Sequence, residues 1–422
     1  MTTTSGGGFT VAGSGGTSTP TDTIANSILN SLNNLATQGG YSPETQSGSG
    51  SLTAPVPGAV GLLQINTTGP STITVPNTYV GISNSSTSPT TIVGPGSNGE
   101  SIVSGSGGNL QFDANGGSGT FAAIGGNNTF SNTVPGGNWS VNLGAGNDSV
   151  NLTSGNNTIS PGGGNNWVTL HNTAPGGSDI VNSNGGNDSV AVFGGATTIN
   201  ATGSGTSDFV GVFGGSLNFV GASGTNATIL GLASSGDSIS GSSGVFVGGT
   251  GGNNTIQASG GNSTLIGGGN GDILSVSGAG NDSLAAGLGN ETLTAANGSG
   301  SYVFYAYNSS NTISAAGGPS NTTMVGGPNS DTFISGSGNA TITGGGGNDV
   351  FVFFKRLAGP TSVTITDFNA GDTIGLLGYG AGYQPQFAAV WGGYAALLPD
   401  GSTITLNTSA TLAQVMGTVK SA

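Results

Sequence analysis

The chain lacks cysteine and has almost no positive charge. The absence of Cys excludes disulfide bonds and leaves the redox compartment undetermined. Lys355, Arg356 and Lys420 are the only Lys or Arg residues against 17 acidic residues, which gives a formal net charge of −14. Nucleic-acid binding needs a basic surface, so we expect no nucleic-acid partner. The same lack of cations argues against adhesion to anionic membranes.

The chain also lacks the residues that common hydrolytic sites require. His171 is the only histidine, so a zinc site with the H-E-x-x-H pattern cannot form. A Ser-His-Asp triad would have to use His171, but no G-x-S-x-G motif is present, and we interpret His171 as a turn residue after a strand at 167–170. Most acids lie in repeated turns and not across a cleft, as glycosidase chemistry would need. We therefore predict that the protein is not an enzyme.

No window of the sequence approaches the about 18 consecutive apolar residues of a membrane span. The N-terminal segment 1–8 has neither a basic region nor an apolar core, so it does not read as a secretory signal peptide. We expect a protein at the cell surface or outside the cell, exported by another signal and not inserted in a membrane.

Glycine is abundant, with 86 residues, and it is patterned. The run at 344–352 fits the nine-residue pattern G-G-x-G-x-D-x-U-x, where U is a large apolar residue. The glycines allow a turn with positive φ and bring backbone carbonyls near a cation, while the Asp supplies carboxylate oxygens. The apolar residue two places later starts a short inward-facing strand.

Further copies precede this run, and their acids occupy the same place in each turn. They lie at 267–275, 277–285, 286–294 and 326–334, and a copy at 336–342 has Ala340 where the acid would be. Farther upstream, Asn147-Asp148-Ser149-Val150 recurs as Asn187-Asp188-Ser189-Val190. Such a fixed period predicts an all-β fold, a parallel β-roll or β-solenoid of glycine-rich repeats, with a short N-terminal helix and a C-terminal β cap.

These repeats resemble the hemolysin-type calcium-binding repeat family, the RTX proteins, which type I systems commonly export. The resemblance covers roughly residues 265–352 and continues weakly back to about residue 105. It implies Ca²⁺ bound between turns on one side of the roll, with Asp272 paired with Glu291 and Asp331 paired with Asp349. It places Asp282 on the opposite side, where Ala340 removes a ligand. Asp148 and Asp188 match the motif only locally.

Composition shifts divide the chain into four expected parts. Residues 1–60 contain a helix at 22–36, with Ile24, Ile28, Leu32 and Leu35 at helical spacing, and a linker at 38–58. The helix either packs on the first coil or serves in assembly. Residues 61–264 form degenerate repeats and 265–354 the calcium-binding roll. The segment 355–422 contains a D-F-N-x-G-D-x-I stretch that resembles the segment after RTX repeats, and it serves as a cap, an export signal, or both.

Several aromatic residues lie in segments that read as strands. We expect their rings to point inward and stack in the core, and they are Trp139, Trp167, Phe193, Phe213, Phe246 and Phe304. A surface of Asn, Ser, Thr and Gly with little charge favours association of copies. The sequence therefore favours an exported, calcium-stabilised scaffold that assembles with itself into a surface layer, filament or biofilm matrix. The alternatives are an adhesin that binds extracellular polysaccharide and an ice-binding protein, although Thr158, Thr198, Thr228 and Thr255 are spaced too irregularly for one threonine row.

Overall fold

The computed structural model describes residues 9–10, 19–52, 54–105, 107–172, 176–203, 206–296, 298–317, 321–355 and 360–422. Residues 1–8, which were considered above as a signal segment, lie outside the described residues. The chain divides into two compact units, Met1–Thr225 (unit 1) and Asn226–Ala422 (unit 2).

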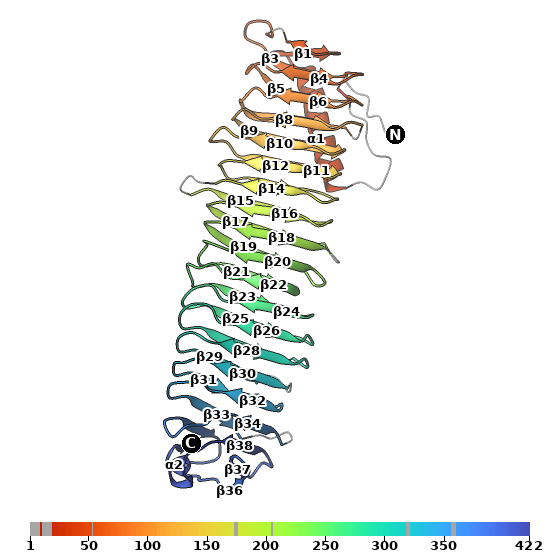
Figure 1. Cartoon of the computed structure of the whole chain (residues 1–422). Helices are drawn as coiled ribbons and strands as arrows, with labels where there is room; N and C mark the ends of the chain where they lie inside the picture. The colour runs from red at the N-terminus through yellow and green to blue at the C-terminus, as the bar shows by residue number, and fades with distance from the viewer. Residues whose placement is uncertain are drawn as a thin grey trace. The chain divides into compact units, whose positions relative to one another are not determined.

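Unit 1 is a parallel β-solenoid in which odd-numbered strands form one sheet, sheet A, and even-numbered strands form a second, sheet B (Figure 1). Each strand pairs in parallel with the equivalent strand of the next coil, so that Val150 lies opposite Val168 and Val168 lies opposite Val190. The strands are β1 (Tyr41–Gln46), β2 (Gly50–Ser51), β3 (Val60–Ile65), β4 (Ser71–Thr74), β5 (Tyr79–Asn84), β6 (Thr90–Val93), β7 (Asn98–Ser104), β8 (Leu110–Asp113), β9 (Ser118–Gly125), β10 (Thr129–Asn132), β11 (Trp139–Ala145), β12 (Ser149–Leu152), β13 (Thr158–Ser160), β14 (Trp167–Leu170), β15 (Ser178–Ser183), β16 (Ser189–Val192), β17 (Ala196–Ala201), β18 (Ser207–Val212) and β19 (Ser216–Gly221).

The core of unit 1 lies between its two sheets. Side chains along a strand alternate between the two faces, and in β12 Val150 and Leu152 are buried while Ser149 and Asn151 are only partly covered. Aromatic rings fill part of this core, where the ring centroid of Phe130 lies 5.1 Å from those of both Phe121 and Trp139. Apolar side chains of successive coils thus pack against one another in the core.

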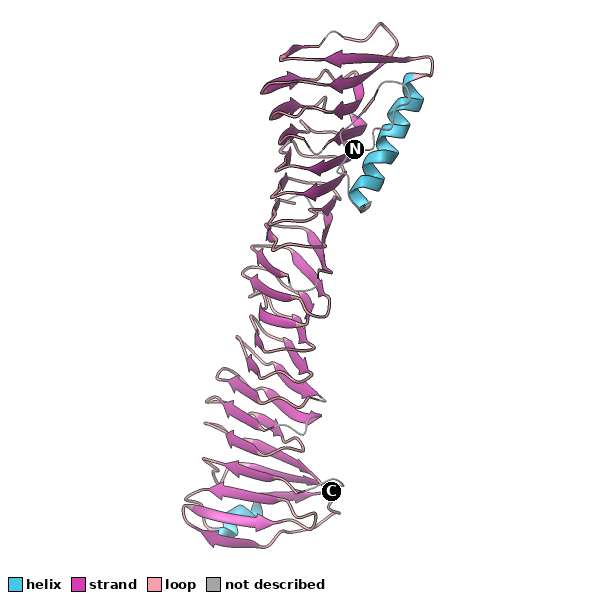
Figure 2. Ribbon diagram, turned by 90° about the vertical axis from the view of Figure 1, so that its right-hand side faces the viewer, coloured by secondary structure: helices cyan, strands magenta, loops and turns pink. Residues whose placement is uncertain are grey.

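Helix α1 (Pro20–Ala36) lies along the outer face of sheet A (Figure 2). Thr19 caps it, because its side chain accepts from the N–H of Asp22 while the Asp22 carboxylate accepts from the N–H of Thr19. The helix buries Ala25, Ile28, Leu29 and Leu32 against Leu62, Val103, Ala122 and Ile124 of β3, β7 and β9. The helix expected at 22–36 is present, but it crosses several coils and does not pack on the first alone.

The segment 38–58, expected to be a linker, instead begins the solenoid. Strand β1 pairs in parallel with β3, and β2 pairs with β4. Composition misled here because β1 carries Pro43, Glu44 and Gln46, residues that are depleted in strands. Pairing with β3 supplies the hydrogen bonds that hold β1 extended.

Unit 2 continues the same two-sheet pattern and ends in a cap. Its strands are β20 (Asn226–Gly231), β21 (Ser238–Gly241), β22 (Ser243–Val247), β23 (Thr255–Ala258), β24 (Ser263–Ile266), β25 (Ile273–Ser277), β26 (Asp282–Ala285), β27 (Thr292–Ala296), β28 (Tyr302–Ala306), β29 (Thr312–Gly317), β30 (Thr322–Gly326), β31 (Thr332–Ile334), β32 (Ala340–Thr343), β33 (Val350–Phe354), β34 (Ser362–Ile365), β35 (Thr373–Leu377), β36 (Phe387–Val390), β37 (Gly393–Leu397), β38 (Thr403–Asn407) and β39 (Val419–Ser421). Strands β36, β37 and β38 form an antiparallel meander, and helix α2 (Leu412–Gly417) leads into β39, which pairs with β35.

The prediction of an all-β solenoid with an N-terminal helix and a C-terminal β cap is confirmed. Neither of the helices in the described parts of the chain is long and apolar enough to cross a bilayer.

Candidate calcium-binding ladders

A row of buried polar side chains runs through unit 2 at the turns that lead into sheet A. Each member stands immediately before a strand and two residues before a buried apolar side chain, as Asp272 stands before Leu274. We call this row the unit 2 ladder. Its members are only 1–3% exposed, and they are Asp237, Asn254, Asp272, Glu291, Asn311, Asp331, Asp349 and Asp372.

Members of the unit 2 ladder are joined from coil to coil by hydrogen bonds. The N–H of Asp331 donates to Oδ1 of Asp349 at 2.8 Å, and the N–H of Asp349 donates to Oδ1 of Asp372 at 2.9 Å. The N–H of Asn254 donates to Oδ1 of Asp272 at 2.7 Å. A turn N–H buried beside a core needs an acceptor. The side chain of the next coil supplies it.

Several ladder carboxylates also accept from glycines of their own turn. Asp272 Oδ2 accepts from the N–H groups of Gly268 and Gly269, at 2.7 and 3.2 Å. Asp331 Oδ2 accepts from the N–H of Gly327 at 3.0 Å. These turns need glycine for lack of space, because a Cβ on Gly344 would lie 2.4 Å from Asp349 Oδ2. The inward-facing carboxylate therefore requires glycine in its turn, and this is why the two occur together in the pattern.

Burial disfavours the charged form of these acids. It raises the pKa of Glu291 to about 8, with a further increase from the nearby charge of Asp272. It raises the pKa of Asp349 to about 7, although the hydrogen bond from the Asp331 N–H opposes this, and the charges of Asp372, Asp331 and Asp367 add to the increase. Burial also raises the pKa values of Asp331 and Asp372. Burial and mutual repulsion thus favour the neutral form of these acids, and a bound cation would favour the charged form.

The structure brings together the two pairs that the family resemblance implies. Asp272 and Glu291 stand on successive coils, with the N–H of Thr292 donating to the carbonyl oxygen of Asp272 at 3.0 Å. Asp331 and Asp349 are hydrogen-bonded neighbours. Oε2 of Glu291 is buried without a hydrogen-bond partner, so a pair of acids here includes one oxygen with unused bonding capacity. The metal-binding role of these four acids stays a prediction.

Asp282 lies on the other side of unit 2, at the start of a sheet B strand. Its Oδ1 accepts from the N–H of Ser263 at 2.8 Å, and on the following coil it is opposite Tyr302. Ala340 occupies the same place three coils beyond Asp282, opposite Thr322. Asp282 therefore has no acidic neighbour in its own row. It is a poor centre for a cation compared with the unit 2 ladder.

Unit 1 has a second ladder, at the turns that lead into sheet B, and this one contains both Asn and Asp. We call it the unit 1 ladder, and its members are Asn128, Asp148, Asn166, Asp188 and Asp208. Nδ2 of Asn166 donates to Oδ1 of Asp188 at 2.8 Å, and Nδ2 of Asn128 donates to Oδ1 of Asp148 at 3.0 Å. Burial raises the pKa values of Asp148 and Asp188 to about 6. The amides thus supply to these acids some of the positive partial charge that a cation would bring.

Sequence reasoning missed several acids that occupy the same kind of place. Asp372 ends the unit 2 ladder, and Asp237 begins it. Asp208 belongs to the unit 1 ladder, and Asp179 caps the N–H of Asn157 at 3.0 Å on the other side of that unit. A simple signal would have found them, since each is an acid followed two residues later by Val or Ile. The nonapeptide pattern has glycines around its acid, which a ladder of carboxylate-to-backbone hydrogen bonds does not always need.

The residues of the unit 2 ladder fit Ca²⁺ in chemistry. Calcium takes 6–8 hard oxygen ligands, often carboxylate and backbone carbonyl oxygens in flexible geometry. Within the described parts of the chain no three acidic, His or Cys side chains converge as a metal site would require. Turn carbonyls would therefore have to complete the shell around a carboxylate pair. A bound Ca²⁺ would neutralise the repulsion between neighbouring acids, and Asp272, Glu291, Asp331 and Asp349 would hold it.

Comparison with known families matches the RTX calcium-binding nonapeptide repeat at residues 140–168, 248–278, 275–301 and 305–352. The chain carries RTX repeats in these segments. The matched segments include Asp148, Asp272, Asp282, Glu291, Asp331 and Asp349, so they fall on both ladders and on the isolated Asp282. RTX repeats bind Ca²⁺, and proteins that carry them are typically secreted. The chain shows no significant similarity to a curated protein or to a solved structure.

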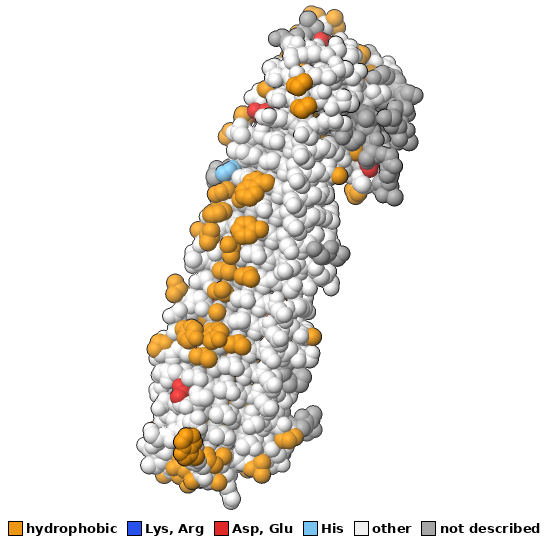
Figure 3. All heavy atoms as spheres, turned by 45° about the vertical axis from the view of Figure 1, so that its right-hand side comes forward, with side chains coloured by type: hydrophobic (Ala, Val, Ile, Leu, Met, Phe, Trp, Pro, Cys, Tyr) orange, Lys and Arg blue, Asp and Glu red, His pale blue; other side chains and the backbone are white. Residues whose placement is uncertain are grey.

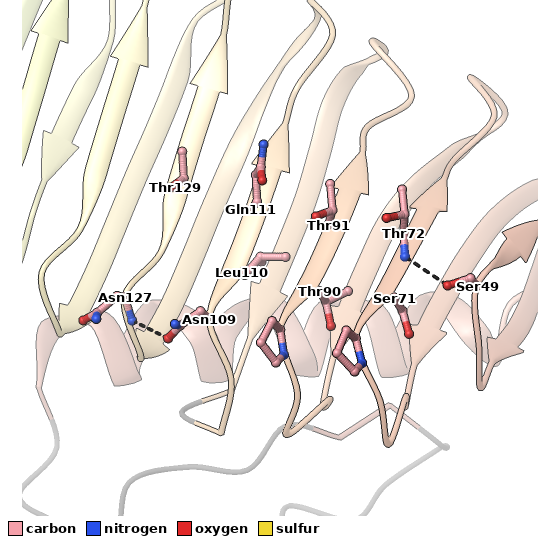
Figure 4. A pocket seen from close by; sticks show the side chains of 12 residues that line it. Ser49, Ser71, Thr72, Thr90, Thr91, Asn109, Leu110, Gln111, Asn127 and Thr129 are labelled. Atoms are coloured by element: carbon pink, nitrogen blue, oxygen red, sulfur yellow. Dashed lines mark hydrogen bonds between the residues drawn. The ribbon is translucent and has the colours of Figure 1, made fainter.

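The outer face of sheet B in unit 1 of this RTX-repeat protein presents a row of polar side chains (Figure 4). Thr72, Thr91, Gln111 and Thr129 follow one another in register and line a shallow groove of about 410 Å³. The threonines considered above for ice binding do not form such a row. Thr158 and Thr198 are separated by Ile180, and Thr228 and Thr255 lie in different sheets.

The expectation of inward aromatic stacking is right for three residues and wrong for three. Trp139, Phe246 and Phe304 are fully buried, whereas Trp167, Phe193 and Phe213 are 53%, 40% and 46% exposed. Neighbouring residues of a strand point to opposite faces, and the inward positions are occupied by Val168 and Val192. Trp167 and Phe193 beside them therefore point outward. His171 follows β14, as a turn residue would, and its ring stacks on that of Phe193.

Proposed function

We propose that this RTX-repeat protein is an extracellular scaffold whose C-terminal unit is stabilised by calcium and which assembles with itself into a layer, filament or matrix. The unit 2 ladder is the observation that carries this proposal. It places five Asp, one Glu and two Asn in consecutive buried turns, and the pKa values of Glu291, Asp331, Asp349 and Asp372 are raised. Such an array folds well only when protonated or when a cation neutralises it.

The location of the acids fits a protein that folds after export. Calcium is plentiful outside cells, so a chain that needs it for unit 2 would stay loosely folded during passage and fold on arrival. The unit 1 ladder supports a scaffold in place of a calcium sensor, because amides of Asn128 and Asn166 donate to Asp148 and Asp188 there and partly replace the charge of a cation. Unit 1 would then be folded with or without calcium, whereas unit 2 would need calcium to fold.

The test is to remove and restore calcium on the full-length purified protein. We expect a chelator to reduce the β-sheet circular dichroism of unit 2 and to shrink the particles seen by light scattering, and added Ca²⁺ to reverse both. Mg²⁺ at the same concentration is the control, since its strict octahedral geometry suits these flexible turns less well. Electron microscopy of the calcium-loaded sample should show ordered polymers. If neither the circular dichroism spectrum nor the particle size changes when the chelator is added, the proposal is contradicted.

A carbohydrate-binding adhesin is the second candidate, and the groove at Thr72, Thr91, Gln111 and Thr129 favours it. Hydroxyl and amide groups at one-coil spacing can hydrogen-bond a polysaccharide laid along the sheet. Retention of monomeric protein on an insoluble neutral polysaccharide would support this candidate over self-assembly. Loss of that retention in Thr91→Val would place the ligand in the groove.

A further inference from the structure

An apolar surface stands on the outer face of sheet B in unit 1, on strands β14, β16 and β18. Its side chains form three rows across consecutive coils, in register. The first row is Trp167, Ser189 and Phe209; the second is Thr169, Ala191 and Gly211; the third, at the strand ends, is His171, Phe193 and Phe213. We call these nine residues the aromatic face. Figure 3 shows orange side chains gathered beside the pale blue imidazole of the single histidine.

The third row is a ridge of stacked rings. The ring centroids of His171 and Phe193 are 4.5 Å apart with planes 10° from parallel, and those of Phe193 and Phe213 are 4.8 Å apart and 9° from parallel. Because each ring covers the faces of its neighbours, the ridge presents mainly ring edges to the solvent. The middle row is small, and its neighbours lean over it: the Nε1–H of Trp167 donates to Thr169 Oγ1 at 2.8 Å, and a Cβ on Gly211 would lie 3.2 Å from the ring of Phe213 and 3.8 Å from that of Phe209.

Large apolar groups are left in water here. Trp167, Phe209, Phe213 and Phe193 are 53%, 43%, 46% and 40% exposed. Exposed apolar patches of this kind mark interaction sites on soluble proteins. The nearest acids, Asp188 and Asp208, are only 1% and 4% exposed, so the aromatic face presents no charge of its own.

We propose that the aromatic face is the surface through which two copies of this chain pair, sheet B of unit 1 against sheet B of unit 1. This inference rests on the proposed self-assembly and names the surface that carries it. Charge argues for a second copy, because in a chain with a net charge of −14 this uncharged face is a place where two copies can meet without like charges opposed. Ring shape argues for it too, since ring edges pack well against another apolar layer, whereas sugar rings stack on ring faces.

A two-fold axis would place the aromatic face of one copy against the same face of the other, which is the usual arrangement of a pair of identical chains. Flat sheets pack face to face at about 10 Å, a distance that interdigitating aromatic side chains fill.

The first experiment measures association of calcium-loaded, full-length protein by sedimentation velocity over a range of concentrations. The variant is the double substitution Phe193→Ser with Phe213→Ser, and the control is Val220→Ser, which removes a side chain that is 46% exposed on sheet A of the same unit. Circular dichroism checks that both variants are folded. We expect association about tenfold weaker or more in the double variant and unchanged in the control, as for loss of central apolar anchors.

A second experiment uses the absence of native cysteine. Ala191→Cys places a single thiol at the centre of the aromatic face, and Thr198→Cys places one on β17 of sheet A. At concentrations at which the wild type associates, we expect alkylation of Ala191→Cys to be slower than in dilute monomeric protein and alkylation of Thr198→Cys to be unchanged; equal rates for Ala191→Cys at both concentrations would contradict the proposed contact.

Three further results would overturn the inference. If the wild type assembles and the double variant assembles equally, the scaffold stands but this surface is not its contact. If the wild type stays monomeric at all concentrations, the proposed self-assembly fails and this interface with it. If the wild type is monomeric but binds a neutral polysaccharide, and the double variant does not, the occupant is a glycan.

Discussion

The backbone N–H of Asp331 donates a hydrogen bond of 2.8 Å to Oδ1 of Asp349, one coil farther along the chain. The same contact links Asn311 to Asp331 at 2.7 Å and Asp349 to Asp372 at 2.9 Å. A residue at this place therefore has two separate tasks. Its side-chain oxygen must cap the preceding turn, and its charge, where it has one, must be neutralised. Asn performs the first task without creating the second.

The substitution Asp349→Asn separates these tasks. The amide oxygen can still accept from the N–H of Asp331, while the repulsion with Asp331 and Asp372 disappears. We expect the calcium-free protein to be as stable as the wild type or more so, and calcium affinity at this site to fall about tenfold, or about 1.4 kcal/mol. Isothermal titration calorimetry with Ca²⁺ measures the affinity, and melting with a chelator measures stability.

Asp113→Asn is the matched control, because it removes one negative charge at a partly exposed position of unit 1 outside both ladders. It should leave calcium binding unchanged. Equal losses of affinity in the two variants would mean that net charge, and not the ladder, governs calcium binding.

The stability of the calcium-free protein should fall as pH rises. The pKa values of Glu291 and Asp349 in the folded chain are about 8 and 7, above their usual values of 4.5 and 3.8. The folded state therefore holds protons that the unfolded state releases, and their contribution to stability is complete below about pH 4 and lost by about pH 8. Melting in chelator at pH 5 and pH 8 should give the higher transition temperature at pH 5.

Calcium should reverse this trend, because it binds deprotonated carboxylates and its affinity rises with pH. The stabilisation that Ca²⁺ adds should be larger at pH 8 than at pH 5. A calcium-free protein that melts at higher temperature at pH 8 would show that the ladder acids ionise freely in the folded state.

Asn166→Ala tests the unit 1 ladder. Asn166 accepts from the N–H of Asp148 through Oδ1 and donates to Asp188 through Nδ2, both at 2.8 Å. Truncation leaves a buried N–H without its acceptor, which costs about 1–3 kcal/mol. Urea unfolding in chelator measures the loss. Asn165→Ala is the control, since Asn165 is exposed and water can replace its hydrogen bonds, so a change within about 0.5 kcal/mol is expected.

Phe351→Ala should destabilise unit 2 through its core. Phe351 is fully buried, with its ring centroid 5.3 Å from that of Phe333 and 6.1 Å from that of Phe368. Removing the ring leaves a cavity and should cost about 3–5 kcal/mol, with calcium present throughout. Phe354→Ala, at a position 40% exposed on the same strand, should cost far less in the same thermal melt. Similar losses in both would mean that the ring stack is not what holds these coils together.

The sequence alone was enough to predict the repeat, the inward apolar residue and four acids of the unit 2 ladder, namely Asp272, Glu291, Asp331 and Asp349. One short pattern joins a glycine turn, a carboxylate and a strand within nine residues, and each of these has a local physical cause. The C-terminal D-F-N-x-G-D stretch was predicted to be a cap or an export signal, and the ladder role of its Asp372 was missed.

Only the tertiary structure decided which coils share a ladder and which side chains face water. Asn128 and Asn166 belong to the ladder because each supplies an acceptor to a backbone N–H of a different coil, 18 residues away, and no local sequence pattern indicates such a contact. Trp167 and Phe193 face solvent because stacked valines took the inward phase of their strands. The sequence shows that side chains along a strand alternate between two faces of the sheet. Only the packing of the coils against one another decides which face becomes the core.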